Sequence, residues 1–291
     1  MSTQQKTSTT TKKSLPGWGW GLLAGVVVIV GIAVFVVMQS PNGNPFSPRN
    51  TPAPAGYVMV SPQDGMKLHY VPAGPFTMGS DEYGDEKPVH TVTLSAFWID
   101  ESEVTNQMYA MCVTDSKCAP PLPTKDIAYY DDPQFADYPV INVTWGDATT
   151  YCLWAGRTLP SEAQWEKAAR GPNGNAYPWG NQAPNKELAN YDNSLDGSTS
   201  KVGQYPNGKS FYGAYDMAGN VFEWVNDWYG DTYYASSPST NPPGPDSGYL
   251  RGVRGGSWDN SNYFIRSATR SGARPDAWVP NIGFRCALPA Q

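Results

Sequence analysis

The chain has 291 residues, and its 29 Gly, 27 Pro and 13% aromatic residues are atypical of a helical bundle. The formal net charge is −6. Of the 20 basic residues, three lysines lie in residues 1–40, which contain no acid, so 17 basic residues face 26 acidic ones in the remainder. An acidic chain without a basic run lacks the electrostatic footprint of a nucleic-acid-binding protein, so no nucleic-acid partner is expected.

The N-terminal segment carries the strongest topological signal. Residues 1–15 are rich in Ser, Thr, Gln and Lys, which predicts a disordered tail. Residues 18–38 then run for 21 residues without a charge. At about 1.5 Å rise per residue this stretch spans roughly 30 Å, the thickness of a bilayer core. A cleaved signal peptide, the rival interpretation, would have a shorter apolar region and a small-residue cleavage site.

The basic residues around this span predict its orientation. Lys12 and Lys13 precede it, and the first base after it is Arg49. The positive-inside rule then places the N-terminus in the cytoplasm and the rest outside. We therefore expect a single-pass cell-membrane protein with its bilayer contact at residues 18–38. Residues 39–55, rich in Pro, Asn and Ser, predict an extended linker before a folded domain over 56–291.

Within that domain, capping patterns predict three helices and short apolar runs predict strands. The first helix begins at Thr105 or Asn106 and ends near Val113. The second and third follow capping patterns at Thr144 and Ser161 and cover Trp145–Ala155 and Glu162–Arg170. Strands are expected at Met66–Val71, Thr91–Ile99, Val253–Trp258 and Gly283–Leu288. The remaining residues read as loop, which predicts a loop-rich α+β domain.

The four cysteines are Cys112, Cys118, Cys152 and Cys286. An even number on the outer side of a membrane predicts two disulfides, and four buried free thiols are the alternative. Cys112 and Cys118 bracket a short loop and can close on each other. No C-x-x-C pattern occurs, so neither a zinc site nor a thioredoxin-type redox site is suggested.

A family resemblance emerges from motifs that occur in order along the domain. They are Phe76–Ser80, Pro88–His90, Thr144–Gly171, Tyr177–Asn181, Tyr212–Trp224, Arg254–Trp258 and Asn281–Ala287. Together they resemble the formylglycine-generating enzyme (sulfatase-modifying factor) family over about residues 58–287. The resemblance implies a C-type-lectin-like α+β fold. It also implies a disulfide between Cys152 and Cys286, and Cys112 is expected to pair with Cys118 because the two are close in sequence.

The resemblance further implies one or two Ca²⁺ sites. The first matches Asp216, Gly219, Val221 and Glu223, where closely spaced oxygens in an irregular turn suit a hard cation. In the alternative interpretation, Asp216 and Glu223 only satisfy backbone amides. The second family site matches Asn190 and Asp196 with the carbonyls of Tyr191 and Ser198, at a spacing shorter than in the enzyme.

The chemistry of the resembling enzyme does not carry over. That oxidase uses two thiols near its C-terminus to bind Cu(I), which needs soft thiolate ligands. The corresponding segment here, residues 252–271, contains no cysteine, and the thiol positions fall at about Asn260 and Asn262. Copper is therefore not expected. A serine nucleophile is also disfavoured, because Ser257 lacks the glycine two residues later that a nucleophile elbow needs.

What remains is a binding surface. The cleft in which the resembling enzyme takes its peptide would be lined here by Trp258, Asn260, Asn262, Tyr263, Arg274 and Trp278. Aromatic rings among polar side chains suit recognition of an extracellular protein or a small molecule. The expectation is a non-catalytic, membrane-anchored ligand-binding domain. The alternatives are a formylglycine-generating oxidoreductase acting on a protein cysteine, or another activity in the same cleft.

Overall fold

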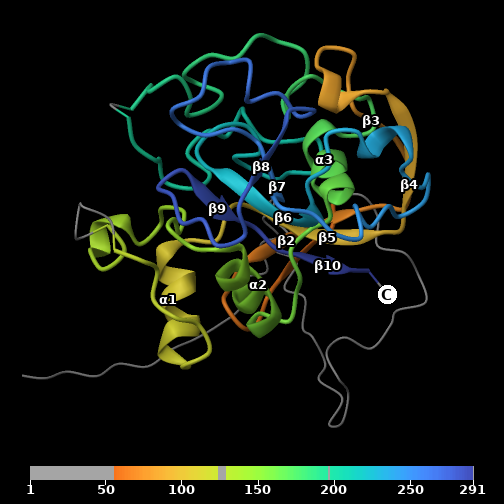
Figure 1. The fold of residues 1–291 in the computed structure, drawn as a ribbon. Helices are drawn as coiled ribbons and strands as arrows, with labels where there is room; N and C mark the ends of the chain where they lie inside the picture. Colours follow the sequence, from red (N-terminus) through yellow and green to blue (C-terminus); the bar gives the residue numbers. More distant parts are fainter. Residues whose placement is uncertain (1–55, 124–128, 196, 291) are drawn as a thin grey trace, which may run out of the picture. The chain divides into compact units, whose positions relative to one another are not determined.

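A computed structural model describes residues 56–123, 129–195 and 197–290. In this part of the chain, three α-helices and ten short strands are joined by long loops (Figure 1). The α+β class and the loop-rich character predicted from the sequence are confirmed.

The strands are short and form three sheets. In chain order they are β1 (Val58–Val60), β2 (Lys67–Val71), β3 (Gly74–Met78), β4 (His90–Leu94), β5 (Phe97–Asp100), β6 (Phe222–Trp228), β7 (Arg251–Arg254), β8 (Arg270–Ala273), β9 (Ile282–Phe284) and β10 (Ala287–Pro289). One sheet has the order β1-β2-β5-β10 and is antiparallel throughout. β3 and β4 form a hairpin. The third sheet has the order β8-β7-β6-β9, and its strands β6 and β9 run parallel.

The three helices begin where their capping residues predict. They are α1 (Asn106–Thr114), α2 (Trp145–Trp154) and α3 (Glu162–Arg170). The Thr144 and Ser161 side chains each accept a hydrogen bond from the backbone three residues on, and both capping boxes are complete. Short 3₁₀ turns occur at Gly84–Glu86, Pro133–Phe135 and Tyr233–Ala235.

Two apolar clusters make up most of the core. The first surrounds Trp165 of α3 and includes Phe76 and Val92 of the β3–β4 hairpin. The second surrounds Trp224 of β6 and packs it against α1 and α2, which lie side by side (Figure 1). Each buried tryptophan donates its indole N–H to an internal acceptor, to Glu223 from Trp165 and to the Val143 carbonyl from Trp224.

The strand expected at Thr91–Ile99 is two strands in two different sheets, β4 and β5. The chain turns at Ser95 and Ala96, and the turn is held from far away in sequence. Ser95 donates its backbone N–H to Asn241 Oδ1 at 2.8 Å, and Asn241 Nδ2 donates back to Ser95 Oγ at 3.0 Å. The apolar run continued through the turn, which is why the sequence predicted a single strand.

Two further strand predictions need correction, and several strands were missed. The strand expected at Val253–Trp258 is β7 and ends at Arg254, where the glycine pair that follows turns the chain. The strand expected at Gly283–Leu288 divides into β9 and β10. The sequence reading also missed β1, β3, β6 and β8.

The expected tail, membrane span and linker, residues 1–15, 18–38 and 39–55, lie outside the described residues. Within the described ranges, no helix is both long and apolar enough to cross a membrane.

Candidate functional site

All four cysteines form disulfides, and both predicted pairs are confirmed. Cys112 in α1 is bonded to Cys118, with Cα atoms 5.3 Å apart. Cys152 in α2 is bonded to Cys286, just after β9, with Cα atoms 5.7 Å apart. Because the chain has four cysteines in total, it retains no free thiol.

The loop after β7, residues 255–264, carries most of the predicted ligand-binding residues and is called here the GGSW loop. It opens with Gly255 and Gly256, whose φ angles of 94° and 71° favour glycine. A Cβ on Gly256 would lie 2.8 Å from the Phe264 carbonyl oxygen. The Asn260 amide oxygen accepts a hydrogen bond from the Ser257 N–H at 3.0 Å and so closes the turn. Asn260 is therefore a structural residue of this loop.

The GGSW loop is fixed to two neighbouring segments through backbone bonds. The half-buried Trp258 donates its N–H to the Asn220 carbonyl at 2.9 Å and accepts at its own carbonyl from Asn193 at 2.8 Å. The Asn260 carbonyl accepts from the Asp192 N–H, also at 2.8 Å. The structure thus places the loop at 190–194, part of the second expected cation site, against the GGSW loop.

The predicted ligand-binding residues divide between two patches. Trp258, Asn260, Asn262 and Tyr263 belong to the GGSW loop, and Tyr263 is 52% exposed. Among the described residues, no hydrogen bond, ion pair or ring contact joins Tyr263 to Arg274 or Trp278.

The second patch is formed by the segment from Arg274 to Trp278. This segment rests on the start of α2, where the Trp145 N–H donates to the Pro275 carbonyl at 3.2 Å. Arg274 pairs with Asp276 at 2.7 Å in solvent, and Trp278 is 52% exposed. The exposure of Trp278 fits a binding role better than a core role.

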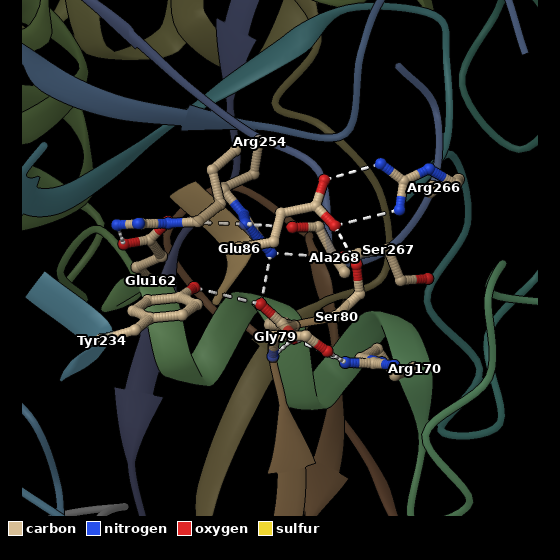
Figure 2. Close-up of polar contacts among 12 residues, drawn as sticks. Gly79, Ser80, Glu86, Glu162, Arg170, Tyr234, Arg254, Arg266, Ser267 and Ala268 are labelled. Carbon is tan, nitrogen blue, oxygen red and sulfur yellow. Dashed lines mark hydrogen bonds and ion pairs between the residues drawn. The ribbon is translucent and has the colours of Figure 1, made fainter. Parts of the chain in front are cut away.

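A buried network of ion pairs supports both ends of the GGSW loop (Figure 2). Arg254, just before the loop, contacts Glu166 of α3 at 2.7 Å and the Ser267 carbonyl at 2.8 Å. Arg270, after the loop, makes two 2.7 Å contacts with Glu162, also in α3. Because unpaired charges in the core are costly, these pairs fix the position of the loop ends relative to α3.

An exposed aromatic cluster lies at the end of the GGSW loop. We call Tyr83, Tyr263 and Phe264 the aromatic corner. The rings of Tyr83 and Tyr263 meet edge to face, with centroids 5.2 Å apart. Arg266 lies 5.0 Å from the Tyr83 ring centre and pairs with the buried Glu86, its two contacts measuring 3.0 and 2.6 Å. Sequence reasoning missed Tyr83, whose signal was its position within the acidic run DEYGDE.

The structure brings together two of the residues expected at the first cation site, Asp216 and Glu223. Glu223 is fully buried at the start of β6, not in an irregular turn, and both its oxygens accept from Arg285 at 2.6 and 2.7 Å. Asp216 is buried 7 residues earlier and accepts from the Gly203 N–H at 2.6 Å. Burial raises the pKa of Asp216 to about 6, and the charge of Glu223 adds to this effect. Gly219 and the buried Val221 lie between them.

Glu103 is a further acid at this site that the sequence did not reveal. It is fully buried, its Oε1 accepts from Asn220 Nδ2 at 3.1 Å, and its Oε2 has no partner. Burial raises the pKa of Glu103 well above its usual range, and Asp216 and Glu223 raise it further. Excess buried carboxylate with a free oxygen suits a hard cation. However, no group of three or more His, Cys, Asp or Glu in the described residues has metal-binding geometry, and Ca²⁺ here stays a prediction.

The second expected site is also only partly described. Asn190 Nδ2 lies 2.9 Å from the Ser198 carbonyl, so two of the expected ligands face each other. Tyr191 is half-buried beside them. Asp196 lies outside the described residues, and calcium at this position remains a prediction.

The histidines do not supply a base for nucleophilic chemistry. His69 Nε2 is 2.9 Å from Glu101, and His90 Nδ1 is 2.8 Å from the Pro88 carbonyl. Ser257 is fully buried and lies 2.6 Å from Asp259, without a histidine among its hydrogen-bond partners. In the part of the chain that the structure describes, neither histidine is hydrogen-bonded to a serine hydroxyl.

Comparisons with known proteins agree with this architecture. Residues 56–290 match the sulfatase-modifying factor enzyme 1-like domain. The formylglycine-generating enzyme of Streptomyces coelicolor is 36% identical, with 76% of this chain and 88% of the relative covered. Serine/threonine-protein kinase Pkn1 of Chlamydia trachomatis is 39% identical over 76% of this chain, which spans only 38% of that relative. PvdO from Pseudomonas aeruginosa has a TM-score of 0.70 at 30% identity, covering 81% of this chain and 99% of PvdO.

Proposed function

Because the chain belongs to the sulfatase-modifying factor family, we propose that it is a non-catalytic member anchored in a membrane, with its domain outside the cytoplasm. Residues 18–38 would form the anchor and residues 39–55 the linker. The domain would bind an extracellular protein or a small ligand through the GGSW loop and the segment at 274–278.

The observation that carries the proposal is the state of the cysteines. Both thiols of each pair are consumed in disulfides, and residues 252–271, where the resemblance implies the family's thiols at about Asn260 and Asn262, contain no cysteine. Asn260 closes a turn through its amide oxygen. Cu(I) requires soft thiolates, so the residues present do not fit that ion and no oxidative step is derived from it.

Binding is supported by the exposure of large side chains on a fixed framework. Tyr263 and Trp278 are each half exposed, and exposed aromatic residues are the usual anchors of an interface. This chain also matches part of a protein named as a kinase, covering 38% of its length. Domains of this kind therefore occur in proteins other than the oxidase.

An oxidoreductase of the formylglycine-generating type is the second candidate. The 36% identity to such an enzyme over 88% of its length favours it. The cysteines could supply thiols for this activity only if their disulfides were reduced. That requirement conflicts with the burial of all four cysteines in the apolar cluster around α1 and α2.

A thiol and copper titration separates the two candidates. The denatured, unreduced full-length chain should contain no thiol that reacts with Ellman's reagent. The native chain should fail to remove Cu(I) from a chromogenic chelator, whereas an active formylglycine-generating enzyme should succeed. Reactive thiols together with tight Cu(I) binding would favour the oxidoreductase.

A further inference from the structure

We propose that β1 is a self-association surface, at which two copies of this chain pair antiparallel through their β1 strands. The inference goes beyond the proposed ligand binding, and it uses the proposed membrane anchor only to choose the partner. It draws on a bare sheet edge, on the apolar side chains along that edge, and on the sequence that leads into it.

The outer side of β1 carries backbone groups that β2 does not use. The Tyr70 N–H donates to the Tyr57 carbonyl at 3.0 Å, and the Ser61 N–H donates to the Met66 carbonyl at 2.8 Å. Bonded and non-bonded pairs alternate along an antiparallel ladder. The odd-numbered residues of β1 therefore direct their N–H and C=O groups to β2, and the even-numbered ones direct theirs to the open edge.

The open edge is apolar and unprotected. Its outward-bonding residues are Val58 and Val60, whose side chains are 43% and 62% exposed, and Tyr57 beside them is 46% exposed. Residues 56–61 contain neither a charged residue nor a proline. Lysine, proline or a covering segment usually shields such an edge from pairing. Within the described ranges, no backbone hydrogen bond from outside the sheet reaches Val58 or Val60.

Two other strand edges of this domain are covered by neighbouring segments. At the far edge of the same sheet, Ala287 of β10 exchanges two backbone hydrogen bonds with Thr158, at 2.7 and 2.9 Å. The outer side of β4 is bonded at Thr93, which accepts from Asn241 at 2.9 Å and donates to the Ser239 carbonyl at 2.8 Å. The edge of β1, by contrast, is free to receive a further strand.

The edge is complementary to a second copy of itself. Antiparallel pairing about a two-fold axis at Met59 sets Val58 of each copy opposite Val60 of the other. Each of these pairs can exchange two backbone hydrogen bonds, and their branched side chains pack across the strands. The two Met59 residues then form the non-bonded pair between them, with Cα atoms about 4.5 Å apart. Such an isologous contact closes as a dimer and uses up both edges.

The position of β1 in the chain favours a second copy over an unrelated strand. The proposed linker ends at residue 55, and β1 begins at Val58. Copies anchored in one membrane would share an orientation and a high local concentration. A high effective concentration strengthens a contact that is weak between free molecules. A short strand edge is a contact of this kind.

The proposed anchor has a sequence pattern that favours the same partner. Gly17, Gly21 and Gly25 recur at every fourth residue. In a helix, small residues at this spacing share one face and let two membrane helices approach closely. A single-pass chain needs another chain for that contact, and a second copy offers the same face. The anchor and the β1 edge thus favour one partner for independent reasons.

Cysteine cross-linking tests the register. The four native cysteines are in disulfides, so an introduced cysteine is the one free thiol. Full-length variants in detergent micelles are oxidised with diamide and followed on non-reducing gels. Met59→Cys should form covalent dimers about tenfold faster than Leu153→Cys, because a disulfide needs Cα atoms within about 7 Å. Leu153, on α2, is 62% exposed and outside the proposed contact.

A proline at the edge tests the backbone bonds. The Val60 N–H faces away from β2, so Val60→Pro removes a donor to the second copy and none to β2. Added to Met59→Cys, it should slow cross-linking about tenfold, because each of the two edge pairs loses a hydrogen bond. The matched change Val60→Thr keeps the N–H and the branched side chain and should leave the rate within about twofold. Melting temperatures check that each variant is folded.

The outcomes separate self-association from ligand binding. Equal rates for Met59→Cys and Leu153→Cys would indicate random collision and overturn the proposal. Equal effects of Val60→Pro and Val60→Thr would overturn it too, because the edge bonds would then play no part. Neither result would affect the proposed ligand binding. Tight Cu(I) binding in the titration above would reject the proposed function and leave the cross-linking pattern as it is.

Discussion

Burial and pairing shift the pKa values of individual carboxyl groups in this domain, and Asp64 and Asp100 show opposite shifts. Asp64 and Asp100 share Arg157, and all three side chains are buried. One guanidinium cannot fully compensate two carboxylates. Burial raises the pKa of Asp100 to about 7, with Asp64 raising it further and Arg157 opposing the shift. The pKa of Asp64 is instead lowered, because Arg157 and the Tyr151 hydroxyl favour its ionised form over the cost of burial.

Asp100→Asn should remove a pH-dependent cost of folding. The pKa of Asp100 is about 7 in the folded chain against an ordinary value of 3.8, so its ionisation destabilises the fold progressively between about pH 4 and pH 7. Asparagine keeps an oxygen for the Cys286 N–H and carries no charge. The free energy of unfolding of the variant relative to wild type should rise across this range, measured by urea denaturation. A constant difference from pH 4 to 7 would contradict the assignment.

Calcium should stabilise the domain through Asp216. At a concentration 100-fold above its Kd, a ligand of the folded state adds about 2.7 kcal/mol. Calcium should therefore raise the melting temperature of wild type and of Asp131→Asn, and excess chelator should reverse the rise. Asp216→Asn should show no such rise. Glu223→Gln is a poorer test, because it also disrupts the buried pair with Arg285. Insensitivity of wild type to calcium and chelator would rule the site out.

The helices of this domain were easier to predict from local sequence than the strands. The start of α2 and all of α3 were predictable, because Thr144 and Ser161 satisfy orphan N–H groups within one turn. The division of Thr91–Ile99 was not, because the break depends on Asn241, 146 residues from Ser95. The buried ion pair between Glu223 and Arg285 likewise joins residues that are far apart in the sequence. Interactions within a few residues were visible in the sequence, and long-range ones were not.

The two disulfides should contribute unequally to stability. Cys152 and Cys286 are 134 residues apart, and Cys112 and Cys118 are 6 apart. In the chain-entropy model the long closure is worth about 5 kcal/mol and the short one about 2 kcal/mol. Replacing the Cys152–Cys286 pair by alanines should therefore lower the free energy of unfolding more than replacing the Cys112–Cys118 pair. Urea denaturation of both variants gives the comparison, and the reverse order would refute the model.

The chain as a whole was predictable in family and in covalent framework, and less so in its site. Ordered motifs identified the family, from which the Cys152–Cys286 disulfide followed, and the short spacing of Cys112 and Cys118 indicated the other. The approach of Tyr83 to the GGSW loop depends on how distant loops pack. Glu103 likewise reaches Asp216 and Glu223 across the fold, which spacing along the chain does not show.

The proposed anchor and its orientation predict where the domain lies in the cell. Lys12 and Lys13 precede an uncharged span, which predicts that the C-terminus lies outside the cytoplasm. Protease added to intact cells, with any outer envelope opened, should remove a C-terminal tag and leave a cytosolic control protein untouched. A tag protected until the cell membrane is lysed would show the opposite orientation.

The central claim is that this family member is not an oxidase, and product formation tests it most directly. Full-length chain, loaded with Cu(I) under air, is incubated with a peptide carrying the Cys-x-Pro-x-Arg signal of sulfatases, beside an active formylglycine-generating enzyme. Mass spectrometry follows conversion of the cysteine. Because the chain has no free thiol to hold copper, the peptide should remain unconverted while the active enzyme converts it. Formylglycine in the peptide treated with this chain would contradict the account.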